Sequence, residues 1–142
     1  MILVDANLLI HASYVESRQH KATKEWLEQC FNGDTRVGLP WESLVAYVRI
    51  ITNPRMFERP LDVVEALRQV EDWLELPTVW TPGPTKRHAA LFTAFSKQVG
   101  IGGNIVQDAH LAALAVEHGL TLCSTDTDFA RFKDLVWYNP IE

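Results

Sequence analysis

Short apolar runs alternate along this chain with longer segments in which apolar residues recur every three or four positions. The short runs are typical of buried strands, and the longer segments are typical of amphipathic helices. Residues 61–74 illustrate the helical spacing, with an apolar face made of Val63, Leu67, Val70 and Leu74. The pattern predicts strands over residues 2–5, 36–39, 79–80, 120–124 and 136–138. It predicts helices over residues 7–14, 20–30, 40–52, 61–74, 85–99 and 104–118, with a short helical turn around residues 128–132.

Strands that alternate with helices predict an α/β fold in which a central, mainly parallel β-sheet is flanked by α-helices. The 142 residues fit a single domain over residues 1–142, and the hydrophobic content of 47% is ordinary for a globular protein. No apolar stretch approaches the ~18–20 residues of a membrane span, and the N-terminus lacks the layout of a signal peptide. Cys30 and Cys123 have no metal-ligand spacing. We therefore expect reduced thiols, a cytoplasmic protein and no membrane partner.

Four acidic residues stand in apolar surroundings and are spread from one end of the chain to the other. Asp5 closes an apolar run, Glu42 and Asp108 lie within apolar helical segments, and Asp126 follows the strand predicted at 120–124. A carboxylate in such surroundings loses hydration and needs a positive partner. Because no Lys or Arg is interleaved with these acids, the pattern favours a bound cation. Carboxylate oxygens favour Mg²⁺ or Mn²⁺, which are suited to the hydrolysis of a phosphodiester.

The predicted elements allow the four carboxylates to converge. In open parallel sheets the site lies beyond the carboxyl ends of the strands, and Asp5 and Asp126 occupy that position. Helical spacing turns Asp108 inward with the apolar residues that follow it, and it places Glu42 and Arg49 on one helix face. We therefore expect one acidic site at one end of the sheet.

The net charge of −5 weighs against a nucleic-acid substrate. Without the four acids of the expected site the remaining charge is −1, so much of the excess belongs to the site itself. Bound divalent cations would make that site attractive to phosphate. The acidic balance also suits a basic protein partner.

Four sequence motifs resemble those of the PIN-domain nucleases, and within them those of the toxin ribonucleases of VapC-type toxin–antitoxin pairs. The motifs contain the four acids in order. They are Val-Asp-Ala-Asn-Leu-Leu-Ile at 4–10, Trp-Glu-Ser at 41–43, Gly-Asn-Ile-Val-Gln-Asp-Ala-His-Leu-Ala at 103–112, and Ser-Thr-Asp-Thr-Asp-Phe at 124–129. The resemblance covers the whole length of the chain, including the order and the spacing of the motifs.

The resemblance implies a parallel sheet flanked by helices and a Mg²⁺-dependent endoribonuclease. Its substrate would be a structured RNA such as tRNA or rRNA, and its cleavage would inhibit translation and growth. A cognate antitoxin that blocks the site is implied as well, and commonly a toxin homodimer. By motif, the acidic set comprises Asp5, Glu42, Asp108 and Asp126. The supporting polar positions are Asn7, Asn104, Thr125 and Asp128.

These residues lead to the hypothesis of metal-assisted hydrolysis of an RNA phosphodiester. Asp5 and Asp108 would hold the principal Mg²⁺, and Asp126 would complete its shell or help to hold a second ion. Glu42 would ligate a metal or orient and deprotonate the attacking water. Arg49 either contacts an RNA phosphate or is solvated at the end of its helix.

The five histidines show no zinc spacing, and we expect them to be structural or on the surface. His110 lies two positions after Asp108, so that we expect it to point to a different side of the helix. No histidine is assigned to the site.

Three alternatives stay open. A haloacid-dehalogenase-like phosphatase also places a nucleophilic Asp after its first strand, but that family has a second Asp where this chain has Asn7. A non-catalytic module could retain the fold and bind RNA or a partner, although the intact acidic set argues against it. A PIN-fold nuclease could instead act in RNA processing or on DNA.

Overall fold

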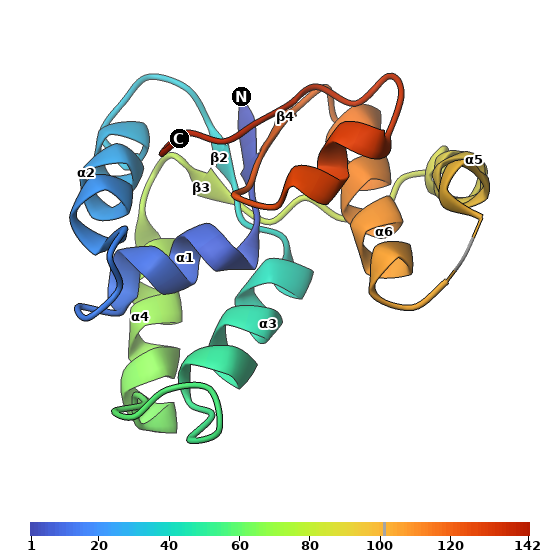
Figure 1. Cartoon of the computed structure of the whole chain (residues 1–142). Helices are drawn as coiled ribbons and strands as arrows, with labels where there is room; N and C mark the ends of the chain where they lie inside the picture. The colour runs from blue at the N-terminus through green and yellow to red at the C-terminus, as the bar shows by residue number, and fades with distance from the viewer. Residues whose placement is uncertain (101) are drawn as a thin grey trace.

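The structure is a computed structural model that describes residues 1–100 and 102–142, and a five-stranded β-sheet lies at its centre (Figure 1). The sheet has the strand order β3-β2-β1-β4-β5, and its strand pairs are all parallel. The strands are β1 (Ile2–Val4), β2 (Val37–Gly38), β3 (Val79–Trp80), β4 (Thr121–Cys123) and β5 (Trp137–Tyr138). The predicted α/β fold with a parallel sheet is therefore confirmed.

Helices connect the strands and cover both faces of the sheet. They are α1 (Ala6–Ser13), α2 (His20–Phe31), α3 (Trp41–Ile51), α4 (Val63–Glu75), α5 (His88–Val99), α6 (Asn104–Glu117) and the 3₁₀-helix η1 (Thr127–Arg131). Figure 1 shows α1–α4 on one side of the sheet and α5, α6 and η1 on the other. Among the residues that the structure describes, no helix is long and apolar enough to cross a membrane.

Alternate residues of the two central strands separate two hydrophobic cores. Val4 of β1 pairs with Cys123 of β4 and packs in the core beneath α1–α4. Leu3 pairs with Leu122 and packs in the core beneath α5 and α6. All four side chains have an exposed fraction of 0%. Because both faces of the sheet are covered, these strands form continuous apolar runs in the sequence instead of alternating apolar and polar residues.

The predicted helices agree with the structure to within a few residues, and the differences have local causes. Helix α4 begins at Val63 and not at residue 61, because Asp62 Oδ1 accepts the backbone N–H of Val64 at 2.7 Å and caps the helix. Helix α5 begins at His88 and not at residue 85. The Thr85 hydroxyl accepts a backbone N–H two residues later at 3.1 Å, a local bond that competes with the first helical turn.

The carboxyl ends of β1 and β4 open toward the same region. The backbone N–H of Asp5 donates to the Cys123 carbonyl at 3.0 Å, so the two segments leave the sheet side by side. Strand β2 leads through Pro40 into α3. The Ser43 hydroxyl then donates to the Val4 carbonyl at 2.8 Å and ties the first turn of α3 to the end of β1. The starts of α1 and α3 and the segment after β4 therefore meet at one edge of the sheet.

Candidate active site

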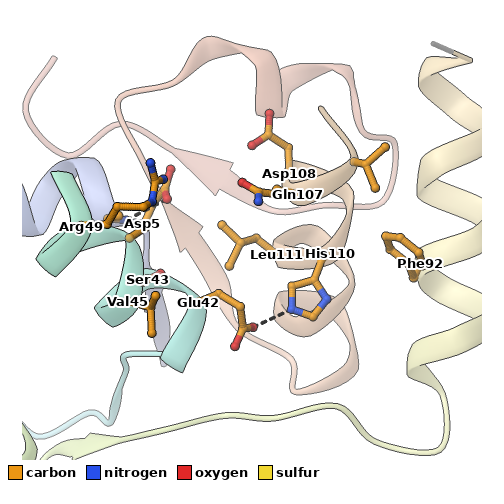
Figure 2. Close-up of a pocket in the computed structure, with 13 residues that line it drawn as sticks. Asp5, Glu42, Ser43, Val45, Arg49, Phe92, Gln107, Asp108, His110 and Leu111 are labelled. Atoms are coloured by element: carbon orange, nitrogen blue, oxygen red, sulfur yellow. Dashed lines mark hydrogen bonds and ion pairs between the residues drawn. The ribbon is translucent and has the colours of Figure 1, made fainter. Parts of the chain in front are cut away.

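A cavity of about 450 Å³ lies beyond the carboxyl end of β1, between α3 and α6 (Figure 2). The ionisable side chains in its wall are Asp5, Glu42, Arg49, Asp108 and His110. Helix α3 contributes Glu42 and Arg49, and α6 contributes Asp108 and His110. A cavity of this size lies in the usual range for ligand sites.

Hydrogen bonds hold Asp5 in one orientation at the start of α1. Its Oδ1 accepts the backbone N–H of Ala6 at 2.8 Å, and its Oδ2 accepts the Ser124 hydroxyl at 2.7 Å and the Asn7 amide at 3.3 Å. Burial raises the pKa of Asp5, the bonds from Ser124 and Ala6 lower it, and the charge on Asp126 raises it again. The pKa stays above its usual value, so the ionised form of Asp5 lacks full compensation from the protein.

Asp108, Asp126 and Asp128 form a carboxylate cluster. One oxygen atom from each residue lies within 4.8 Å of the others. Burial raises the pKa of Asp108 to about 6, and the charges on Asp126, Asp5 and Asp128 contribute to the increase. A hard divalent cation prefers oxygen ligands of this kind, and its charge would relieve their mutual repulsion. The donor set therefore fits Mg²⁺ or Mn²⁺, and the geometry adds Asp128 to the acids expected to lie together.

The segment after β4 places Asp126 and Asp128. Asp126 caps the 3₁₀-helix η1, because its Oδ1 accepts the backbone N–H of Asp128 at 2.9 Å. Arg131 lies 3.6 Å from the Asp128 carboxylate, in an ion pair whose two side chains are well exposed. Such a surface pair contributes little to stability, so it leaves Asp128 available to a metal ion.

Ser124 is a site residue that the sequence analysis did not single out. Its side chain is fully buried, with an exposed fraction of 0%. The hydroxyl donates to Asp5 and accepts both the Asn7 amide and the backbone N–H of Asp126, each at 3.0 Å. Ser124 thus links the first acid to the last motif. Its place directly after β4, at the carboxyl edge of the sheet, is the sequence signal that could have found it.

The predicted supporting residues differ in their placement. Asn7 bridges Asp5 and Ser124 through its amide nitrogen, and its Oδ1 accepts the backbone N–H of Thr125 at 3.4 Å. Thr125 therefore joins this network through its backbone. Asn104 is exposed in the first turn of α6 and is not among the described residues that line the cavity.

Glu42 turns toward His110 across the cavity (Figure 2). Its Oε2 lies 2.6 Å from His110 Nε2. The bond from His110 lowers the pKa of Glu42 and outweighs the effect of partial burial. Glu42 is therefore ionised, and the histidine is the donor. No histidine was assigned to the site from the sequence, yet His110 lines the cavity and binds Glu42.

Arg49 is exposed and lines the cavity. It lies on the same face of α3 as Glu42, about two helical turns further along the chain. It is the only Lys or Arg among the described residues that line the cavity. A guanidinium beside a group of carboxylates suits an anionic ligand such as a phosphate, which it can bind through two parallel hydrogen bonds.

Known proteins resemble this chain over nearly its whole length. The profile of the PIN domain family matches residues 2–135. The chain is 44% identical over 140 residues to "Ribonuclease VapC37" of Mycobacterium tuberculosis, covering 99% of this chain and 97% of that protein. It is 36% identical over 143 residues to "Ribonuclease VapC33" of the same species, covering 99% of both chains.

Solved structures share the fold at lower sequence identity. The structure of VapBC2 from Rickettsia felis bound to a promoter DNA fragment matches with a TM-score of 0.68 and 17% identity, covering 98% of both chains. A toxin–antitoxin complex from Klebsiella pneumoniae matches with a TM-score of 0.66 and 17% identity, covering 100% of this chain and 99% of that one. The family match, the identities and the fold agree, and the chain belongs to the PIN-domain family and, within it, to the VapC-type proteins.

Proposed function

We propose that this protein is the toxin of a toxin–antitoxin pair and acts in the cytoplasm as a metal-dependent endoribonuclease. The observation that carries the proposal is the cluster of Asp108, Asp126 and Asp128 beside Asp5, in which mutual repulsion helps to raise the pKa of Asp108 to about 6. Such a cluster is unfavourable without a cation. The relatives of this chain that carry the name ribonuclease support RNA as the substrate.

Asp5, Asp108 and Asp126, joined by Asp128, would hold one or two Mg²⁺ or Mn²⁺ ions. A bound ion supplies positive charge that lowers the pKa of a coordinated water and offsets the charge developing on the phosphate oxygens. The remaining roles belong to the protein. Ser124 and Asn7 hold the Asp5 carboxylate in a fixed orientation, and Asp108 has to lose its proton before it can act as a ligand.

Glu42 and Arg49 complete the mechanism from helix α3. Glu42 is ionised and lines the cavity, so it can orient a water molecule and accept its proton. Arg49 can hold the phosphate that is attacked or its neighbour. Attack by water does not need the ribose 2′-hydroxyl, and it leaves a 5′-phosphate and a 3′-hydroxyl. We propose a structured RNA such as tRNA or rRNA as the target, whose loss would inhibit translation and growth.

An apolar groove next to the cavity supports a partner that blocks the site. The groove has a volume of about 280 Å³ and lies between α3 and α4, and Val45 and Arg49 line both the groove and the cavity. Trp41 and Leu67 in its wall have exposed fractions of 53% and 46%. A partner segment with an apolar face would bury these side chains and could place a basic side chain against the acids. We infer that a cognate antitoxin binds here, and we expect the toxin itself to form a homodimer.

Cleavage of RNA by the purified, partner-free protein tests the proposal. Total cellular RNA would be incubated with Mg²⁺ or with EDTA, using the wild-type chain and the variants Asp108→Asn and Asp72→Asn. Asp72 lies exposed on α4 and serves as a matched control. We expect discrete Mg²⁺-dependent cuts that Asp108→Asn abolishes and Asp72→Asn retains.

Two other results would support the alternatives. Cleavage of DNA with no cleavage of RNA would identify a DNA nuclease of the same fold. Mg²⁺-independent RNA binding without cleavage, unchanged in Asp108→Asn, would identify a binding module and contradict the proposed function.

A further inference from the structure

A hydrogen-bonded series of four side chains runs from the cavity to a carboxylate at the far end of α6. Glu42 binds His110 at 2.6 Å, His110 Nδ1 lies 2.9 Å from His88 Nε2, and His88 Nδ1 contacts the carboxylate of Glu117. His88 is the first residue of α5, and Glu117 is the last residue of α6. The series therefore joins three helices, α3, α5 and α6.

At the far end of the series, burial and two hydrogen bonds hold the Glu117 carboxylate in place. The Glu117 side chain has an exposed fraction of 0%. Its two oxygens accept the backbone N–H of Thr85 and the ring N–H of His88. Burial raises the pKa of Glu117, but the bonds from Thr85 and His88 outweigh this effect and the pKa lies below its usual value. Glu117 is therefore an ionised, buried acceptor with a fixed position.

The two carboxylates determine which ring nitrogens carry hydrogen. An ionised carboxylate can only accept, so His88 Nδ1 donates to Glu117 and His110 Nε2 donates to Glu42. The nitrogens that face each other, His88 Nε2 and His110 Nδ1, lie 2.9 Å apart, and a hydrogen bond between them forms when one of the two rings carries a second ring hydrogen. The orientation of the His110 ring is thus set from Glu117 through His88.

Packing reinforces this orientation. The Phe92 ring lies one helical turn after His88 and stacks on it, with centroids 6.1 Å apart and an interplanar angle of 6°. His110 meets both rings nearly at right angles, with centroids 4.8 Å from His88 and 6.4 Å from Phe92. Helix α5 thereby provides a wall that holds the His110 ring on one side, while Glu42 lies on the other.

We propose that His88 and Glu117 are positioning residues of this site, which act through His110 to hold the Glu42 carboxylate at the cavity. The side chain of Glu42 has an exposed fraction of 38%, and His110 is the one hydrogen-bond partner of its carboxylate among the side chains that the structure describes. The inference rests on the proposed function for the role of Glu42 toward the attacking water. Residues that orient the groups around a metal centre are typically worth about 10–100-fold in activity.

Two substitutions of His88 separate its two hydrogen bonds. In His88→Asn the side-chain amide stands near the position of Nδ1, so the bond to Glu117 can persist while the bond to His110 is lost. In His88→Gln the longer side chain places its amide near Nε2, so the bond to His110 can persist. His20→Asn is the control, because His20 Nδ1 bonds to the His11 carbonyl at 3.0 Å, outside the series.

Mg²⁺-dependent RNA cleavage by these variants gives the first readout. We expect His88→Asn to lower kcat by about 10–100-fold while KM changes by less than about twofold, since substrate contacts are retained. His88→Gln should recover most of the loss, and His20→Asn should match the wild-type chain. An unchanged kcat in His88→Asn, with Asp108→Asn inactive, would overturn the positioning role and leave the proposed function intact.

A second readout does not depend on activity. Long-range ¹H–¹⁵N spectra of the histidine rings report which ring nitrogens carry hydrogen. In the wild-type chain and in His88→Gln we expect His110 Nε2 to carry hydrogen, and in His88→Asn we expect the His110 signals to shift. If the wild-type chain cleaves no RNA, the proposed function fails, and these spectra still decide the positioning role. Unchanged His110 signals in His88→Asn would overturn it.

Discussion

The Ser124 hydroxyl donates a hydrogen bond of 2.7 Å to Asp5 Oδ2, although the two residues are 119 positions apart in the sequence. The bond joins the ends of β1 and β4, which are neighbours in the sheet. Ser124 also accepts the backbone N–H of Asp126 at 3.0 Å. One buried hydroxyl therefore fixes the first acid of the site and the segment that holds the last one.

Replacing this hydroxyl should cost both stability and activity. In Ser124→Ala, Asp5 loses a donor, and Asn7 and Asp126 lose an acceptor. We expect a loss of about 1–3 kcal/mol in the free energy of unfolding, measured by urea denaturation, together with slower RNA cleavage. Ser96→Ala is the matched control, because among the described residues the Ser96 hydroxyl is buried without a hydrogen-bond partner. Its removal should leave stability unchanged or slightly higher. Equal stability in the two variants would show that the Ser124 bonds are dispensable.

The acidic site should reduce the stability of the metal-free protein at neutral pH. The pKa of Asp108 is about 6 in the folded chain and 3.8 as the reference for the unfolded chain. Between these values the folded state binds more protons than the unfolded state. Stability therefore falls as the pH rises through this window and stays lower above it.

Asp108→Asn removes this penalty, so the variant should be more stable than the wild-type chain at neutral pH. We expect a gain of about 1–2 kcal/mol, discounted for the partial exposure of Asp108. The difference should shrink as the pH falls below about 6 and disappear only below the unfolded pKa of 3.8. Urea denaturation in EDTA at several pH values measures it. A difference that does not change with pH would contradict this account of Asp108.

Metal binding should depend on the same titration of Asp108. Mg²⁺ binding should strengthen as the pH rises, whereas the stability of the metal-free protein falls. Mg²⁺ needs the ionised form of Asp108, whose pKa of about 6 places that form above this pH. Millimolar Mg²⁺ should therefore raise Tm clearly at about pH 8 and much less at about pH 5. In Asp108→Asn the increase at the higher pH should be small. The same increase at both pH values would place the metal elsewhere.

Arg49→Ala tests the contact with phosphate. Arg49 is exposed at the cavity wall, so its loss should not disturb the core. We expect KM for RNA to rise roughly tenfold, equivalent to about 1.4 kcal/mol, with a smaller change in kcat. Arg18→Ala, in the exposed connection between α1 and α2, is the control and should keep the wild-type KM. A wild-type KM in Arg49→Ala would mean that Arg49 is simply solvated.

The sequence predicts the parts of the site that depend on local pattern and strand order. Apolar runs with both faces covered identify β1 and β4, and Asp5 and Asp126 follow these strands directly. Because parallel strands end at the same edge of the sheet, the closeness of these acids can be expected without a structure. Asp108 follows from helical spacing in the same way.

Contacts between distant side chains could not be predicted in this way. The bonds of Glu42 with His110 and of Asp5 with Ser124 span 68 and 119 positions. They depend on how α3, α6 and β4 pack against one another, which periodicity does not specify. The two hydrogen-bond partners of the His88 ring are 22 and 29 positions away in the sequence, and its role becomes visible only once α5 lies against α6.

Cleavage in water enriched in oxygen-18 tests the central claim most directly, because it follows the oxygen that attacks phosphorus. Partner-free protein would cut a short RNA target with Mg²⁺, and mass spectrometry would read the ends of the fragments. Hydrolysis by a water that Glu42 orients predicts a 3′-hydroxyl end and a 5′-phosphate that carries one labelled oxygen. A 2′,3′-cyclic phosphate without the label would show attack by the ribose hydroxyl, and it would contradict the mechanism assigned to these acids.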